Sequence, residues 1–266
     1  MMRRLEYKSP DPFQKLSTMM ERRGALRKFH SHATSLLARA YRKAFGNAMF
    51  SLGDRVLDLT PFLFGSLINH RLSLEDARPN EVCIVTPSHN AKQLIERFAG
   101  SAPYARDVQL RVEQIDKLLA FIQLREVYAH FDTAIVADLL FLLDDQQRHD
   151  FLSFLYDALT TQGKLVLLDL FTANGNTAKV GPMTFAPSQF IQRNSRVYKE
   201  LARMSHRTSF ASLHHDIDTS GLFTKSIPHG SSSPRFGSVT LGDEYQVLYT
   251  VYSRVEAPVL PSVSRG

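Results

Sequence analysis

The sequence has little of the chemistry that would indicate a redox, disulfide-bonded or membrane protein. It contains one cysteine and no tryptophan among 266 residues. One cysteine cannot form a disulfide within the chain, and Cys83 lies between Val82 and Ile84, so we interpret it as a small buried apolar residue. No apolar run reaches the length of about 18 residues that a membrane-spanning helix needs. These absences exclude an internal disulfide framework and a spanning helix.

Several catalytic motifs are also missing. There is no Gly-rich phosphate loop, no zinc-protease motif, no cysteine pair and no Gly-x-Ser-x-Gly nucleophile turn. His214, His215 and Asp216 stand together, but adjacent histidines point in different directions and a metal site needs three or four converging ligands. We therefore interpret residues 214–218 as a polar connection and predict no metal site.

The first residues give a weak indication of location. They lack the apolar stretch of a secretory signal, and they carry Glu6 and Asp11, whereas transit peptides are poor in acids. We expect an intracellular protein, cytoplasmic by default, with mitochondria as the alternative. The oligomeric state is not predicted.

What the sequence does have is a basic N-terminal segment. Residues 1–43 hold eleven lysines or arginines against three acidic residues, a net charge of +8, so the rest of the chain carries −2 of the total +6. After an irregular arm over residues 1–17, apolar residues recur every three or four positions and predict one amphipathic helix over residues 18–46. Its polar face carries Arg22, Arg23, Arg27, Lys28, Arg39, Arg42 and Lys43.

Such a charged face favours an acidic partner, either RNA or a protein complex, bound by that helix. The alternatives are an anionic membrane surface and a solvated helix face with no partner.

From residue 50 onward short strands alternate with helical patterns. Strands are expected at 55–59, 81–85, 108–112, 131–137 and 164–169, and Ser88 and Asp144 or Asp145 are placed to begin helices. Gly163 is expected to end the second of these helices. This alternation predicts a parallel sheet covered on both faces, in one domain over residues 50–255 with a loose tail at 256–266. A helix at 187–204, a loop at 231–234 and strands at 222–227 and 245–252 complete the expectation.

Four segments in this order resemble class I S-adenosylmethionine-dependent methyltransferases. They are Gly53–Leu59, Phe131–Ala137, the turn and strand Leu159–Asp169, and Ser220–Phe223 followed by the strand 245–252. The resemblance implies a Rossmann-like α/β fold with strand order 3-2-1-4-5-7-6 and an antiparallel strand 7. It implies S-adenosylmethionine as the cofactor if the protein is active, and no cofactor otherwise.

The cofactor residues of that family are mostly replaced. Asp58 keeps the acid of the first loop, but Thr60, Phe62 and Phe64 stand where the family has three glycines, and only Gly65 follows. Glycine allows the backbone to approach a ligand closely, whereas phenylalanine adds bulk there. Strand two ends at Thr86 instead of the acid that binds the ribose hydroxyls, and a threonine hydroxyl makes one weaker contact.

Two further acids match positions in the family's cleft. The resemblance implies an adenine contact for Asp116, and for Asp138, which follows strand four, a role in positioning substrate or the methyl group. Ligands in such sheets bind outside the carboxyl ends of the strands. The alternatives are a surface carboxylate for Asp116 and a helix-start residue for Asp138.

Two functions follow from this sequence. The first is a non-catalytic binding or assembly module that keeps a methyltransferase fold with a degenerate cofactor site and contacts RNA or a protein complex. The second is an active, divergent methyltransferase acting on a small molecule or RNA, with Asp138 as the catalytic residue and Asp58, Thr60, Gly65, Thr86 and Asp116 around the cofactor. A dehydrogenase-like nucleotide-binding protein is a weaker third, because the sequence has no Gly-x-Gly-x-x-Gly turn.

Overall fold

The computed structural model of the chain describes residues 11–21, 36–48, 52–60, 67–68, 79–100, 107–115, 117–118, 129–172, 210–226, 236–241 and 245–256. The expected helix 187–204, the loop 231–234 and most of the tail lie outside them.

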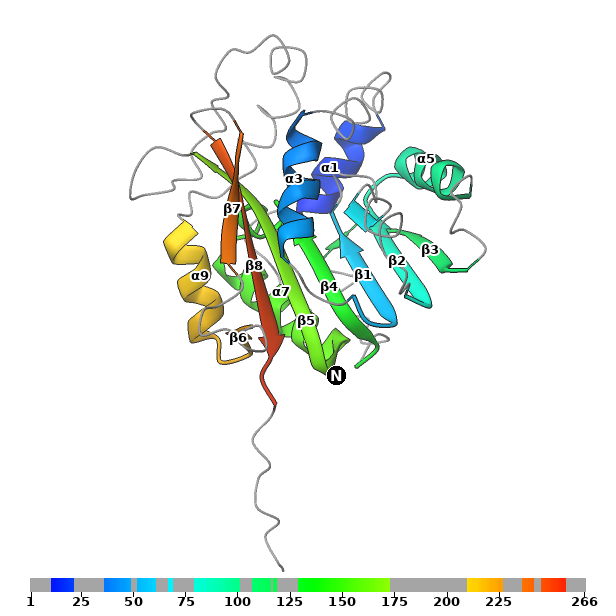
Figure 1. The fold of residues 1–266 in the computed structure, drawn as a ribbon. Coiled ribbons are helices and arrows are strands. Elements are labelled where there is room, and N and C mark those ends of the chain that lie inside the picture. The colour runs from blue at the N-terminus through cyan, green and yellow to red at the C-terminus, as the bar shows by residue number, and fades with distance from the viewer. Residues whose placement is uncertain are drawn as a thin grey trace, which may run out of the picture.

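An eight-stranded sheet forms the centre of the molecule (Figure 1). Its parallel part consists of β1 (Arg55–Leu59), β2 (Glu81–Thr86), β3 (Gln109–Gln114), β4 (Phe131–Ala137) and β5 (Leu159–Thr172). β8 (Tyr245–Arg254) runs antiparallel to β5, and β6 (Phe223–Lys225) and β7 (Phe236–Leu241) pair with its other side. The order β3-β2-β1-β4-β5-β8-β6 confirms the predicted one, with β8 as its antiparallel seventh strand. β7 was not predicted.

The strands form where apolar runs can be covered on both faces. β1, β2 and β4 are buried at nearly every position, as expected for parallel strands between helical layers. α5 (His89–Gly100) packs against β2 and β3, α7 (Asp145–Ala158) against β5, and α9 (Phe210–Thr219) against β6. A short 3₁₀ turn, η2 (Leu140–Leu142), follows β4.

Helix starts follow the predicted caps. Asp144 begins α7 with a capping box, in which its side chain accepts from the Gln147 N–H and the Gln147 side chain accepts from the Asp144 N–H. The Ser88 hydroxyl accepts a hydrogen bond of 3.2 Å from the Ala91 N–H at the beginning of α5. Both expectations are confirmed.

The end of α7 differs from the expectation. α7 stops at Ala158 and the chain enters β5 at once, so Gly163 lies inside the strand and does not end the helix. The pairing of β4 with β5 shifts between Phe131 and Thr133, which marks a bulge in this part of β5. A Cβ atom on Gly163 would lie 2.7 Å from the Thr160 carbonyl oxygen. A side chain at position 163 would therefore clash with the main chain of the bulge, and glycine avoids this clash.

The N-terminal segment also differs. Its described residues, 11–21 and 36–48, form the helices α1 (Pro12–Met20) and α3 (Leu36–Asn47), whereas the sequence predicted an irregular arm to residue 17 and one helix from 18 to 46. α1 begins at Pro12 because Asp11 caps it: the Asp11 carboxylate accepts a hydrogen bond of 2.9 Å from the Phe13 N–H, and proline suits the first helical position. The prediction of an arm is wrong for residues 12–17.

Candidate functional site

The carboxyl ends of the parallel strands gather the polar residues predicted from the sequence. Asp58 is the penultimate residue of β1, Thr86 is the last residue of β2, and Asp138 directly follows β4. β1 lies between β2 and β4 in the sheet, so these three residues share one edge. Figure 1 shows α1 and α3 beyond this edge. This carboxyl edge is the candidate site, because ligands of open α/β sheets bind there.

Asp58 is completely buried and only half satisfied. Its Oδ1 accepts hydrogen bonds from the Thr60 N–H at 2.9 Å and the Thr60 hydroxyl at 2.5 Å. Its Oδ2 is buried and has no hydrogen-bond partner among the residues that the structure describes. Burial raises the pKa of Asp58 to about 6, although the Thr60 hydrogen bonds act against this increase. Oδ2 is therefore a buried acceptor to which no described donor is bonded.

Thr86 presents a second open acceptor on the adjacent strand. The residue is 1% exposed, and within the described part of the chain its Oγ1 has no hydrogen-bond partner. Its main-chain carbonyl accepts from the Ile115 N–H at 2.9 Å, which ties the end of β2 to the end of β3. A buried polar atom without a partner carries a free-energy cost of about 1–3 kcal/mol. Asp58 Oδ2 and Thr86 Oγ1 lie on neighbouring strands at this edge, and the described residues hold two more such atoms on β8, Thr250 Oγ1 and Arg254 Nε.

Asp138 is engaged by the N-terminal segment. The Tyr41 hydroxyl on α3 donates a hydrogen bond to its Oδ2, and both residues are buried. Asp138 has a φ of 53°, which turns the chain sharply after β4, and its N–H donates to the Leu168 carbonyl at 3.2 Å. This brings it beside Asp169 of β5, which is 2% exposed.

Asp138, Asp169 and the Tyr41 hydroxyl form a buried cluster of acidic groups. Burial first, and then the charge of Asp138, raise the pKa of Asp169 well above its ordinary value. Burial and the same charge raise the pKa of Tyr41. Both shifts favour the protonated forms of Asp169 and Tyr41, and the Tyr41 hydroxyl donates its hydrogen bond to Asp138. The sequence analysis missed Tyr41 and Asp169, although a tyrosine on a buried helical stripe needs a partner for its hydroxyl, which was the available signal.

α1 is bonded at both of its ends to segments that follow β2 and β3. Beyond β2, its C-cap residue Glu21 accepts hydrogen bonds from the Ser88 hydroxyl at 2.5 Å and from both the main chain and the side chain of Asn90. Beyond β3, Asp11 accepts from the Leu118 N–H at 3.1 Å. On the apolar side of α1, Phe13, Leu16 and Met20 are fully buried.

Other predicted site residues are placed only in part. Gly65, Phe62, Phe64, Asp116, Arg22, Arg23, Arg27 and Lys28 lie outside the described residues. On α3, Arg39 and Lys43 are exposed and Arg42 is half-buried. Burial and the neighbouring Arg39 lower the pKa of Arg42.

The segment 214–218 is not a polar connection but part of α9. His214 faces inward, where it is hydrogen-bonded to the Tyr252 hydroxyl of β8, and His215 is exposed. Burial lowers the pKa of His214 to about 4, so it is neutral at physiological pH. Within the described part of the chain, no three histidine, cysteine or acidic side chains converge as a metal site.

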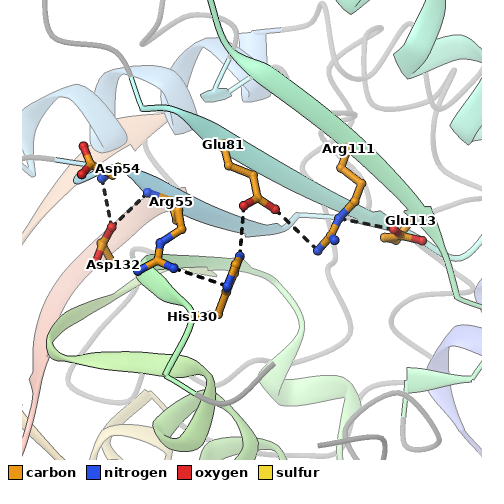
Figure 2. Close-up of polar contacts among 7 residues, drawn as sticks. All are labelled: Asp54, Arg55, Glu81, Arg111, Glu113, His130 and Asp132. Carbon is orange, nitrogen blue, oxygen red and sulfur yellow. Dashed lines mark hydrogen bonds and ion pairs between the residues drawn. The ribbon is translucent and has the colours of Figure 1, made fainter. Parts of the chain in front are cut away.

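Near the amino edge of the sheet, by contrast, polar and charged side chains are bonded to one another. Figure 2 shows them linked in a row; they are Arg55, His130, Glu81, Arg111 and Glu113. His130 Nε2 lies 3.0 Å from Glu81, and Arg111 Nε lies 3.3 Å from Glu113. Asp132 Oδ2 accepts from the N–H groups of Asp54 and Arg55, each at 3.0 Å. The row joins the starts of β1, β2 and β4 to Arg111 and Glu113 along β3 and has a structural role.

Comparison with known proteins confirms the fold. No protein-family model and no curated sequence matches the chain, but solved structures do. The mitomycin 7-O-methyltransferase MmcR matches with a TM-score of 0.57 at 11% identity, over 91% of this chain and 60% of that one. The pyocyanin biosynthetic protein PhzM matches with a TM-score of 0.56 at 14% identity, over 90% and 61%.

A third match is a geranyl diphosphate methyltransferase solved with geranyl diphosphate and sinefungin. Its TM-score is 0.52 at 12% identity, over 82% of this chain and 78% of that one. The chain thus spans about three fifths of the first two proteins and more of the third. At these identities the likeness establishes the class I methyltransferase fold. No described helix combines the length and apolar character needed to cross a membrane.

Proposed function

Since the chain has the fold of class I methyltransferases, we propose that it is a non-catalytic member of that fold, a binding or assembly module with a degenerate cofactor site. One observation carries the proposal: Asp138, at the position expected to face substrate, is buried and hydrogen-bonded to Tyr41 of the chain's own helix α3. A carboxylate held in this way is not free to position a methyl acceptor. The contacts of α1 beyond β2 and β3 support the same conclusion.

The described residues do not fit S-adenosylmethionine as the fold family holds it. Thr60 has a side chain where the family's first glycine allows close approach, and that side chain is buried against Asp58. Thr86 offers one hydroxyl where a carboxylate would accept two hydrogen bonds from a ribose. We derive no catalytic step through this cofactor.

The partner of such a module would be acidic, either RNA or a protein complex. Arg39 and Lys43 support this, because they are exposed on α3 while Ala40, Tyr41 and Ala44 of the same helix are buried. The basic residues thus lie on the side of the helix that the core does not use.

A second function is favoured by a specific observation. The open acceptors on Asp58 and Thr86 are what a bound ligand with hydrogen-bond donors would satisfy. They favour an active, divergent methyltransferase in which Asp58 and Thr86 hold the donor molecule and Asp138 positions the acceptor.

Calorimetric titration of the full chain with S-adenosylmethionine and S-adenosylhomocysteine separates the two functions. The non-catalytic proposal expects dissociation constants weaker than about 1 mM, a binding free energy smaller in magnitude than about 4 kcal/mol. Dissociation constants on the order of 1 μM would contradict it.

If binding is found, an Asp138→Asn variant is compared with an Asp54→Asn variant, which changes an exposed carboxylate at the opposite edge. The enzyme hypothesis expects methyl transfer to be lost only in the Asp138 variant.

A further inference from the structure

Two carboxyl groups lie on neighbouring strands where β4 ends. The pairing of β4 with β5 sets Ala137 opposite Leu168, so the residues that follow them, Asp138 and Asp169, are neighbours across the two strands. The Asp138 N–H donates to the Leu168 carbonyl at 3.2 Å, which holds the two segments together. Asp138 is 8% exposed and Asp169 is 2% exposed. Two buried carboxylates placed as neighbours repel each other, so the pair binds a proton more strongly than a carboxylate in water does.

The same pair is a point of attachment for helix α3. The Tyr41 hydroxyl donates a hydrogen bond to Asp138 Oδ2, and Tyr41 is 1% exposed. Next to Tyr41 along the helix, Ala40, Ala44 and Phe45 are buried, and α3 packs against β5, β7 and β8. Docking of α3 therefore takes one oxygen of the Asp138 carboxylate out of water.

The ionisable groups that act on the pair come from the elements around it. They are Tyr41 of α3, Tyr252 of β8 and, bonded to Tyr252, His214 of α9. Among the described residues, no lysine, arginine or histidine forms an ion pair with Asp169. Burial and the charge of Asp138 raise the pKa of Asp169, and a main-chain hydrogen bond from Asp138 offsets this increase only in part.

We propose that this pair makes the docking of α3 depend on a proton: Asp138 and Asp169 share the proton while Tyr41 is bound, and its loss weakens the attachment of the helix. Opening of α3 lets water reach Asp138 and relieves the repulsion, so the open state holds fewer protons than the docked state. Rising pH therefore favours opening between the ordinary carboxyl pKa of 3.8 and the raised pKa of the docked pair. This dependence concerns the helix alone and holds for a non-catalytic and an enzymatic function alike.

The first test is hydrogen exchange of the α3 amides in the full chain from pH 5 to 8, after correction for the pH dependence of the chemical exchange step. In wild type the opening constant should rise by up to tenfold per pH unit over part of this range, because opening releases one proton. Asp169→Asn preserves the size of the side chain without its charge, so its α3 amides should open to the same extent at every pH.

Asp54→Asn changes an exposed carboxylate at the opposite edge of the sheet and is the matched control, which should behave as wild type. The amides of α5 are the internal reference and should not share the dependence. A pH dependence that is absent from wild type, persists in Asp169→Asn or appears equally in α5 would overturn the proposal.

The second test follows the proton directly and needs no variant. Carbon-13 resonances of the aspartate carboxyl groups, correlated with the main chain, report the titration of Asp138 and Asp169 in wild type. At least one of the two should titrate above the ordinary aspartate pKa of about 3.9 by one pH unit or more. Ordinary titration of both groups would overturn the proposal. Tight binding of S-adenosylmethionine would contradict the non-catalytic function without affecting either test.

Discussion

For Asp58, the sequence predicts the position in the fold but not the burial, the hydrogen bonds or the pKa. The sequence places it at the end of the first strand, and the structure confirms that position. Only the structure shows that the carboxyl group has no exposed surface, bonds Thr60 through one oxygen and leaves the other open. Burial depends on what covers β1, which includes segments distant in the sequence, so no local pattern could predict the raised pKa.

This raised pKa predicts a pH dependence of stability. The pKa of Asp58 is about 6 in the folded protein against 3.8 for a free carboxyl group. Below about pH 4 the group is neutral in both states, and between pH 4 and 6 the unfolded chain releases its proton first, so folding stability falls as pH rises. The loss is complete above pH 6 and amounts to at most about 3 kcal/mol, two pKa units at about 1.4 kcal/mol each. The raised pKa of Asp169 acts in the same direction.

Urea unfolding of Asp58→Asn and wild type at pH 4, 5, 6 and 7 checks this expectation. The asparagine keeps an acceptor for Thr60 without a charge, so the variant should lose less stability than wild type between pH 4 and 7. Asp54→Asn, an exposed carboxylate, serves as the control and should follow the wild-type curve. Parallel curves for Asp58→Asn and wild type would show that the group titrates alike in both states.

At the scale of elements, local signals succeeded where the chain uses side chains close in sequence. The caps of α5 and α7 lie within three residues of the groups that they bind, and the sequence predicted both. The same signal at Asp11 and Pro12 was available but was read as an irregular arm. The extent of β5 was not available, because its first residues are strand through pairing with β4 and its later ones through pairing with β8.

Two glycine substitutions should have opposite effects on stability. Gly163→Ala places a Cβ atom 2.7 Å from the Thr160 oxygen and 2.8 Å from the Leu159 Cβ, both in the bulge of β5, so the strand must shift. We expect a loss of about 1–3 kcal/mol, the range for overpacked sites. Gly46 lies near the end of α3, where an added Cβ atom would meet no described atom within 4 Å apart from its own helix backbone and chain neighbours. Gly46→Ala should therefore gain about 0.5–1 kcal/mol.

Urea unfolding of both variants measures the difference, and each serves as the control for the other. A stable Gly163→Ala protein would mean that the bulge can adjust without cost.

For the whole molecule, the uneven charge predicts how a partner would bind. The first 43 residues carry +8 and the remainder −2, and Arg39 and Lys43 are exposed on α3. Contacts of basic residues with phosphates release counterions, so affinity falls as salt rises, with a logarithmic slope of about 0.7 per contact for single strands.

Fluorescence anisotropy with a single-stranded RNA, measured from low to moderate salt, tests this partner. Replacing both Arg39 and Lys43 by glutamine should reduce the slope by about 1.4, the contribution of two contacts. Lys92→Gln on α5 removes a positive charge from another part of the molecule and should leave the slope unchanged. If the double variant keeps the wild-type slope, these residues do not contact the RNA.

The resemblance to class I methyltransferases implied the sheet order. The sequence by itself determined the alternation of strands and helices, the places of Asp58, Thr86 and Asp138 at one edge, and the basic character of the N-terminal segment. These follow from hydrophobic periodicity, from the rule that parallel strands end together, and from counting charges. Only the tertiary structure decided that Tyr41 of α3 binds Asp138, that Glu21 binds Ser88 beyond β2, and that Asp11 binds the main chain of Leu118 beyond β3. Those contacts join residues 67 to 107 positions apart. Because such pairings depend on how the elements pack, no window of the sequence contains them.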